Sequence, residues 1–224
     1  MLARIVCGLT LAAAVFGAAA AAPTSEAGVS CASTYSYAGI ANGAVGRAVR
    51  ATITPLARPD VQWGHVAGWV GVGGRNLGAN GRDAWIQVGF SGFYGGVTKL
   101  YYEVAVPGAA PRYHEVDAAP VIGTPRKVAV GEIDARPNWW QVWVDGKRVG
   151  EPVYLAGSHG AWTPMATAES WNAGQGRCNG FSYRFDGAAV NTRHGWRPLT
   201  PGTVFRSPGY ALQRRAGGFT ASLR

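Results

Sequence analysis

Charged residues are scarce in this chain of 224 residues, which has 15% Asp, Glu, Lys and Arg against 47% hydrophobic residues. An intrinsically disordered protein shows the reverse balance, so that class is excluded. Leu, Glu and Lys, which favour helices, are also few, whereas the chain has 33 Gly, 9 Trp and 9 Tyr. Because Trp and Tyr favour strands and glycine weakens helices, this composition indicates an all-β protein.

The residue patterns of several common chemistries are missing as well. No serine stands in a nucleophile elbow, and no glycine-rich phosphate loop is present. The histidines are far apart in sequence and lack the spacing of metal ligands. We therefore expect neither a metal nor another cofactor, and we interpret as surface or structural residues all four histidines: His65, His114, His159 and His194.

A long apolar run occurs only near the N-terminus, over residues 5–22, where Arg4 is the only charge before Glu26. Small residues that suit cleavage follow, up to Ala27. This pattern is typical of a secretory signal peptide, so we predict a leader over residues 1–27 and one secreted domain over residues 28–224. An uncleaved anchor is the alternative, although the run is near the lower length limit for spanning, and no later stretch could span.

Cysteine is rare: Cys7 lies in the predicted leader, and only Cys31 and Cys178 follow it. Two cysteines in an exported chain most simply form one disulfide, which here would join residues 147 positions apart. The alternative is a pair of free buried thiols.

Acidic residues are absent after Asp186, and the whole chain carries a formal charge of +9. We predict a basic C-terminal segment, at about residues 187–224, that adheres weakly to anionic polymers of a cell envelope. A solvated surface that aids solubility is the alternative. No nucleic-acid-binding motif accompanies the segment, so we expect no specific nucleic acid partner. Its arginines are Arg193, Arg197, Arg206, Arg214, Arg215 and Arg224.

Apolar residues alternate with polar ones in many short runs separated by Gly- and Pro-rich turns. Asp145-Gly146 between two such runs predicts a tight hairpin. Short strands at this spacing predict an antiparallel β-sandwich or concanavalin A-like jelly roll. The predicted strands cover residues 48–53, 66–72, 84–90, 100–106, 139–144, 147–149, 167–171, 181–185 and 218–223.

Four of these strands carry an aliphatic face and an opposite face of aromatic residues with Gln or Glu, because side chains two positions apart point the same way. If the four lie side by side, they form an aromatic groove for an extended polymer. An ordinary solvent-facing surface is the alternative. The residues of the aromatic faces are Trp85 and Gln87; Tyr101 and Glu103; Trp139, Gln141 and Trp143; and Thr167, Glu169 and Trp171.

The fragment Glu132-Ile133-Asp134-Ala135-Arg136 is similar to the Glu-x-Asp-x-Glu strand of laminarinase-type endoglucanases. Arg136 stands in the acid/base position, however, and a retaining glycosidase needs a second carboxyl group about 5 Å from the first. We therefore interpret Glu132 and Asp134 as edge or turn charges.

A second resemblance rests on four motifs in a fixed order. They are Trp69-Val70-Gly71-Val72-Gly73-Gly74, Trp85-Ile86-Gln87-Val88-Gly89, Tyr101-Tyr102-Glu103-Val104 and Ala168-Glu169-Ser170-Trp171. Together they resemble the eqolisin-type glutamic endopeptidases over about residues 65–186. The resemblance implies a secreted β-sandwich without a cofactor, in which Gln87 and Glu169 are catalytic.

The resemblance also implies that Glu103 is a substrate-binding or structural residue. With Trp69, Trp85, Tyr101 and Trp171 it would bind an extended polypeptide.

Three departures separate this chain from the family pattern. Gly73 stands where the family has Asp, Ser170 separates Glu169 from Trp171, and the pI is near 9.9 where the family tends to be acidic. The alternative function is therefore a non-catalytic secreted sandwich that binds glycan or envelope polymer in its aromatic groove.

Overall fold

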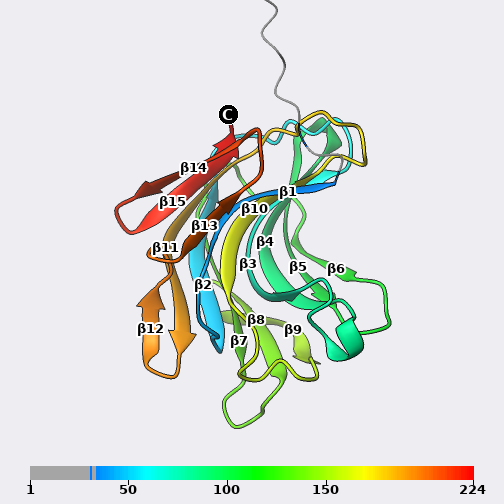
Figure 1. The fold of residues 1–224 in the computed structure, drawn as a ribbon. Coiled ribbons are helices and arrows are strands. Elements are labelled where there is room, and N and C mark those ends of the chain that lie inside the picture. The colour runs from blue at the N-terminus through cyan, green and yellow to red at the C-terminus, as the bar shows by residue number, and fades with distance from the viewer. Residues whose placement is uncertain (1–30, 32–33) are drawn as a thin grey trace, which may run out of the picture.

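The computed structural model describes residue 31 and residues 34–224, so the predicted leader lies outside the described residues. Two antiparallel sheets pack face to face (Figure 1). The predicted all-β sandwich is thus confirmed. In the part of the chain that the structure describes, no helix has the length and apolar character needed to cross a membrane.

The first sheet has seven strands in the order β13-β1-β10-β3-β4-β5-β6. Half of the neighbouring pairs along it, β13-β1, β1-β10 and β10-β3, are far apart in sequence, as in a jelly roll. In sheet order, the strands are β13 (Thr203–Arg206), β1 (Tyr35–Ala41), β10 (Met165–Trp171), β3 (His65–Gly74), β4 (Ala84–Phe93), β5 (Val97–Ala105) and β6 (Arg112–Asp117).

The second sheet has eight strands in the order β14-β15-β11-β2-β7-β8-β9, with β12 beside β11. Two short 3-10 helices, η1 (Ala79–Gly81) and η2 (Tyr94–Gly96), flank β4. The strands are β14 (Tyr210–Arg215), β15 (Gly218–Leu223), β11 (Ser182–Thr192), β2 (Ala48–Pro55), β7 (Arg126–Glu132), β8 (Trp139–Val144), β9 (Lys147–Tyr154) and β12 (Gly195–Pro198).

Each strand predicted from alternation overlaps an observed strand, because the aliphatic face packs into the space between the sheets. In β10, Ala166 and Ala168 are fully buried in this core. The largest fully buried side chains include Trp140, Phe90 and Phe185. Strands β1, β6, β7, β12, β13 and β14 were not predicted, since their sequences alternate less regularly or are very short.

The predicted hairpin at Asp145-Gly146 is confirmed as the connection between β8 and β9. Both residues have positive φ, 49° for Asp145 and 78° for Gly146. A type I′ turn requires this at both central positions, and its twist matches that of the flanking strands.

The predicted single aromatic surface is wrong in one respect, because its four strands do not share a sheet. Strands β4, β5 and β10 lie in the seven-stranded sheet, whereas β8 lies in the eight-stranded sheet. Trp139 and Trp143 therefore face outward on the opposite side of the sandwich. Alternation shows which residues share a face of one strand, but strand order depends on pairing between distant segments.

The basic C-terminal segment is built into both sheets rather than extending as a tail. It supplies β12, β14 and β15 to one sheet and β13 to the other. Arg214 donates a hydrogen bond to the Gly202 carbonyl, and Arg215 lies 3.9 Å from the Asp186 carboxylate.

The interpretation of Glu132 as an edge or turn charge is wrong, whereas Asp134 does lie in an exposed turn. Glu132 ends β7, and its side chain is only 1% exposed. It accepts hydrogen bonds from Arg47 and the Asn138 amide and contacts His159. Strand β7 ends before Asp134, so the three positions of the endoglucanase-like fragment do not share a strand.

The predicted disulfide between Cys31 and Cys178 is confirmed, with a Cα–Cα distance of 5.1 Å. Cys178 follows β10, the strand that carries Glu169. The bond therefore joins the segment before β1 to the segment after β10, and β1 and β10 are themselves neighbours in the sheet.

We predict that replacing both Cys31 and Cys178 with serine lowers the free energy of unfolding by about 4–5 kcal/mol. The bond closes a loop of 147 residues, and without it the unfolded chain regains that loop entropy. Urea unfolding of the variant and of the oxidised protein would measure the difference. Equal midpoints and slopes would show that the bond does not stabilise the fold.

Candidate functional site

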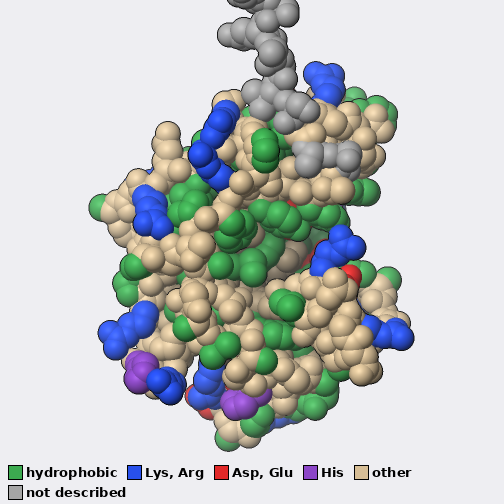
Figure 2. Space-filling model, in the orientation of Figure 1, with side chains coloured by type: hydrophobic (Ala, Val, Ile, Leu, Met, Phe, Trp, Pro, Cys, Tyr) green, Lys and Arg blue, Asp and Glu red, His purple; other side chains and the backbone are tan. Residues whose placement is uncertain are grey.

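A groove of about 650 Å³ lies on the open face of the seven-stranded sheet. Figure 2 shows this side of the molecule hollowed across its middle, with hydrophobic side chains in the hollow. Strands β1, β10, β3, β4 and β5 supply its lining from the side chains that alternate away from the core. Residues that line it include Tyr35, Tyr37, His65, Trp69, Gly73, Arg75, Asp83, Trp85, Gln87, Glu103, Met165 and Glu169.

Glycines on this face make room for the larger side chains. Gly71 stands opposite Gln87 across the β3–β4 pair, and a Cβ there would come within 2.9 Å of the Gln87 Cβ. Gly73 has a φ of +84°, and its Cβ would lie 2.2 Å from the Ala84 carbonyl oxygen. The glycines of the Trp69–Gly74 motif thus permit a hollow where ordinary side chains would fill the face.

Glu169 contacts two side chains of β3 through its carboxyl oxygens. The Trp69 indole nitrogen donates to its Oε2 at 3.1 Å, and the His65 Nε2 lies 3.3 Å from its Oε1. The residue is only 7% exposed. A carboxylate so little exposed depends on such partners, since burying an unpaired charge is costly.

Gln87 is also 7% exposed and donates through its Nε2 to the Tyr101 hydroxyl at 3.0 Å. Tyr101 lies buried beneath the groove and stacks on Tyr113, with 4.9 Å between ring centroids. Among the residues that the structure describes, none binds the Gln87 Oε1. The amide oxygen is therefore available to a ligand.

Gln87 and Glu169 share the groove but do not touch. Gln87 pairs with Gly71 and Glu169 pairs with Ala67, so the two lie four residues apart along the intervening strand β3. No hydrogen bond joins them in the described part of the chain. Trp69 and Tyr101, which lie between these two levels, bind Glu169 and Gln87 respectively.

The groove is a site of perturbed ionisation. Burial raises the pKa of Glu103, the nearby Glu169 carboxylate raises it further, and the hydrogen bond from the Trp85 indole, at 2.9 Å, opposes the rise. Burial also raises the pKa of Tyr37, and Glu169 adds to this effect. Burial and then Glu169 likewise raise the pKa of Tyr101. Two carboxylates therefore interact across a poorly solvated surface, which is typical of functional sites.

An aromatic cluster marks the Glu169 end of the groove. Tyr35 on β1 pairs with Trp171 on β10, and their rings stack with centroids 6.2 Å apart. Trp171 is 37% exposed, and its ring centroid lies 5.6 Å from that of His65. Exposed stacked rings of this kind offer apolar contact area to a ligand.

The structure brings together most residues of the predicted site. Trp69, Trp85, Gln87, Glu103 and Glu169 line the groove. The remaining two flank it, since Tyr101 lies beneath Gln87 and Trp171 lies in the aromatic cluster.

Three groove residues were missed in the sequence. His65 was interpreted as a surface or structural residue, yet its ring contacts Glu169. Its place opposite Trp171 follows from strand pairing, which the sequence does not reveal. Tyr35 and Tyr37 belong to β1, which was not predicted. The alternation of these tyrosines with Ser36 and Ala38 is the sequence pattern that could have predicted strand β1.

The clusters of acidic and histidine residues do not suit a metal. Within the described residues, no group of three or more His, Cys, Asp or Glu side chains could hold an ion.

The fold is similar to solved structures of glutamic peptidases. Scytalido-glutamic peptidase with a transition state analog inhibitor has a TM-score of 0.60 at 14% identity, and the same peptidase with a peptide based transition state analog has 0.59 at 13%. SCP-B, a member of the eqolisin family in a complex with the tripeptide Ala-Ile-His, has 0.57 at 14%. Each match covers 85% of this chain and 98% of the other.

The resemblance to eqolisins that the motifs predicted is thus confirmed at the level of the fold. No family model and no curated protein matches the sequence.

We predict that replacing Trp85 with phenylalanine raises the pKa of Glu103 further, because the substitution removes the donor that stabilises its carboxylate. Glu103 would then take up its proton at a higher pH than in the unmodified protein. Titration of the side-chain carboxyl carbon by NMR would measure the change. The control is Trp139→Phe, on the other sheet, which should leave the Glu103 titration unchanged. A pKa that stays constant or falls in Trp85→Phe would contradict this assignment.

Proposed function

We propose that the protein is a secreted hydrolase of peptide bonds, with Glu169 and Gln87 as its catalytic pair. One observation carries the proposal: the two residues selected by the eqolisin-like motifs lie on different strands, yet both line one groove and are almost fully buried. The similarity of fold to glutamic peptidases supports the reaction class. The Cys31–Cys178 disulfide supports an oxidising location, as does the leader pattern.

In the proposed reaction Glu169, as the carboxylate, takes a proton from a water molecule, and the water oxygen attacks the carbonyl carbon of the scissile bond. The Gln87 amide orients the water and donates to the oxyanion that develops. Protonated Glu169 then gives its proton to the leaving amine as the carbon–nitrogen bond breaks. No covalent bond to the protein forms, and Glu169 ends as the carboxylate.

The resting contacts of the pair indicate what must change for this step. The Gln87 Nε2 donates to the Tyr101 hydroxyl, so the amide must turn toward the Glu169 end of the groove when substrate binds. Trp69 and His65 keep the Glu169 side chain directed into the groove meanwhile. Catalytic hydrogen bonds often form fully only with substrate present.

The dimensions and lining of the groove support an extended polypeptide as substrate. Its volume of about 650 Å³ suits several side chains of such a chain, and Trp85, Tyr35 and Trp171 offer apolar contacts along it. SCP-B was solved with a tripeptide and scytalido-glutamic peptidase with a peptide based analog, which supports the same ligand class here.

Two departures from the family pattern, Gly73 and Ser170, are compatible with the proposed site. An Asp at position 73 would place its Cβ 2.2 Å from the Ala84 carbonyl oxygen, so the backbone of this chain suits only glycine there. Ser170 is buried on the core side of β10, which puts Trp171 on the same face as Glu169. The indole thereby joins the aromatic cluster that flanks the groove and does not enter the core.

We predict that Glu169→Gln abolishes cleavage of denatured protein, because an amide cannot accept and return the proton. The substitution keeps the shape of the side chain, and the core lies on the opposite strand faces, so thermal melting should move little. Purified protein would be assayed from acidic to neutral pH. Cleavage by Glu169→Gln at the unmodified rate would contradict the mechanism.

We further predict that Gln87→Ala lowers kcat by about a hundredfold, the effect of losing one oxyanion donor worth roughly 3 kcal/mol. The matched control is Gln141→Ala on β8, which removes the same amide on the other sheet and should leave kcat unchanged. Gln141 is buried and donates to three backbone carbonyls, so thermal melting of both variants is needed, and a loss of kcat in Gln87→Ala that is matched by a loss of its folded fraction would trace the effect to stability. If the unmodified protein cleaves nothing at any pH, the proposal fails and binding of a polymer without cleavage takes its place.

A further inference from the structure

A second groove, of about 860 Å³, lies on the outer face of the eight-stranded sheet. The core between the two sheets separates it from the candidate catalytic groove, so its residues take no part in the proposed reaction. Its floor consists of small side chains on two neighbouring strands, Ala48 on β2 with Ala129 and Gly131 on β7. Small residues there hollow the sheet surface between the larger side chains on either side.

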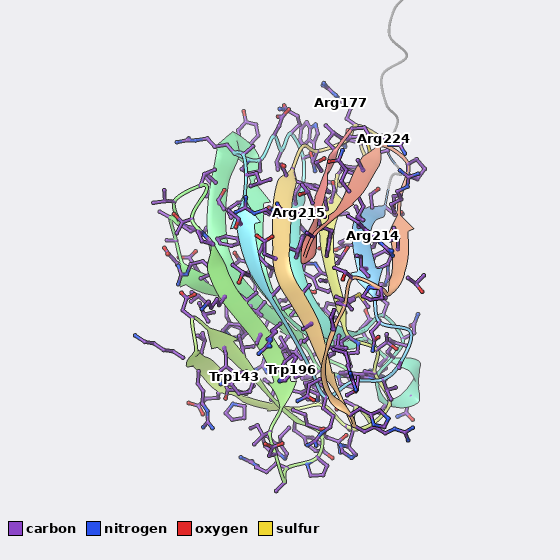
Figure 3. The ribbon with its side chains drawn as sticks, turned by 90° about the vertical axis from the view of Figure 1, so that its left-hand side faces the viewer. Trp143, Arg177, Trp196, Arg214, Arg215 and Arg224 are labelled. Atoms are coloured by element: carbon purple, nitrogen blue, oxygen red, sulfur yellow. A yellow bond between two sulfur atoms is a disulfide. The ribbon has the colours of Figure 1, made fainter. Side chains whose placement is uncertain are left out.

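Two tryptophans border this outer groove. Trp143 on β8 leans over the floor, since a Cβ at Gly131 would lie only 3.2 Å from its ring. Trp196 on β12 borders the other side and is 40% exposed. Figure 3 shows both near the same end of the sheet. Flat indole surfaces open to solvent suit the apolar face of a sugar ring or another planar group.

Cations accompany the tryptophans. The register sets Arg50, Ala129, Trp143 and Arg148 side by side across four strands. The Arg50 guanidinium lies 4.1 Å from the centre of the Trp196 ring, and Lys127 stands on the same outward face. In the described part of the chain, no carboxylate forms an ion pair with Arg50, Lys127 or Arg148.

A fourth cation is already neutralised by the protein. Arg47 forms ion pairs with Glu132 at 3.3 Å and with Asp134 at 3.4 Å. Asp134 is fully exposed at this side of the groove. The outer groove therefore offers three unpaired cations, two indoles and one accessible carboxylate.

We propose that this outer groove binds an acidic polysaccharide, with sugar rings packed on Trp143 and Trp196 and sugar carboxylates paired with Arg50, Lys127 and Arg148. Spaced cations match a polymer that carries one anion on each ring, and the Asp134 carboxylate accepts hydrogen bonds from sugar hydroxyls. A single-stranded nucleic acid carries comparable charges with bases in place of sugar rings, and the titration below separates it from a polysaccharide.

The outer groove is also a better site for the polyanion binding expected from the basic composition than the C-terminal segment is. Six arginines of residues 187–224 suggested that the C-terminal segment attracts polyanions, but four of them are spread over strands of both sheets and two lie just outside strands. The outer groove instead places unpaired cations beside aromatic rings. The cations attract any polyanion, whereas the rings give selectivity for sugars.

Calorimetric titration with polygalacturonate tests the proposal. Binding is expected, and it should weaken steeply as salt rises because ion pairs contribute. The methyl-esterified polymer, which has the same backbone without the charges, and an oligo-dT strand of equal charge should each bind at least about tenfold more weakly. Oligo-dT that binds as tightly as polygalacturonate would overturn the proposal in favour of a nucleic acid, and equal binding of the esterified polymer would exclude a role for the cations.

Matched variants locate the site. Lys127→Gln with Arg148→Gln should weaken binding by about tenfold. The control, Arg177→Gln with Arg224→Gln, removes the same charge at the opposite end of the molecule (Figure 3) and should change it less than about twofold. Trp143→Ala should weaken binding about tenfold while Trp143→Phe retains most of it. Equal losses in the two double variants, or no loss in Trp143→Ala, would overturn the proposal, provided that thermal melting shows each variant folded.

Discussion

The arrangement of this protein depends on strict alternation along the strands of the seven-stranded sheet. In β10, Ala166 and Ala168 are fully buried between the sheets, so Thr167 and Glu169 must point to the open face. A slip of one residue in the pairing of β10 with β3 would send Glu169 into the core and two alanines into the groove. The free-energy cost of burying that carboxylate in the core therefore disfavours the shifted register. The observed register in turn places the groove-lining side chains on the open face.

The same rule explains how much of the fold could be predicted. Alternation identified which face of β4, β5 and β10 carries Gln87, Glu103 and Glu169, and Asp145-Gly146 identified the β8–β9 turn. It could not identify strand order, so β8 was placed with the wrong neighbours. Nor could it bring His65 to Glu169, because that contact depends on pairing between segments about a hundred residues apart.

The two faces of the sandwich solve different physical problems with similar residues. In the groove of the seven-stranded sheet, Glu169 is buried and Glu103 is partly buried, and each accepts a hydrogen bond from an indole, Trp69 for Glu169 and Trp85 for Glu103. On the outer face of the other sheet Lys127 and Arg148 are exposed, and the indoles of Trp143 and Trp196 are partly exposed. Tryptophan thus serves as a hydrogen-bond donor on one side and as a contact surface on the other.

The position of β1 has a consequence for when the molecule becomes functional. This strand enters the sheet between β10 and β13, which follow it by more than a hundred residues. It brings Tyr35 and Tyr37 to the groove. During synthesis, β1 therefore waits for β10 until residues 165–171 have emerged and for β13 until residues 203–206 have emerged, and pairing over such distances is slow. A chain that ends before β10 would lack Glu169 and the strand on which β1 pairs, so the groove could form only after residues 165–171 have been made.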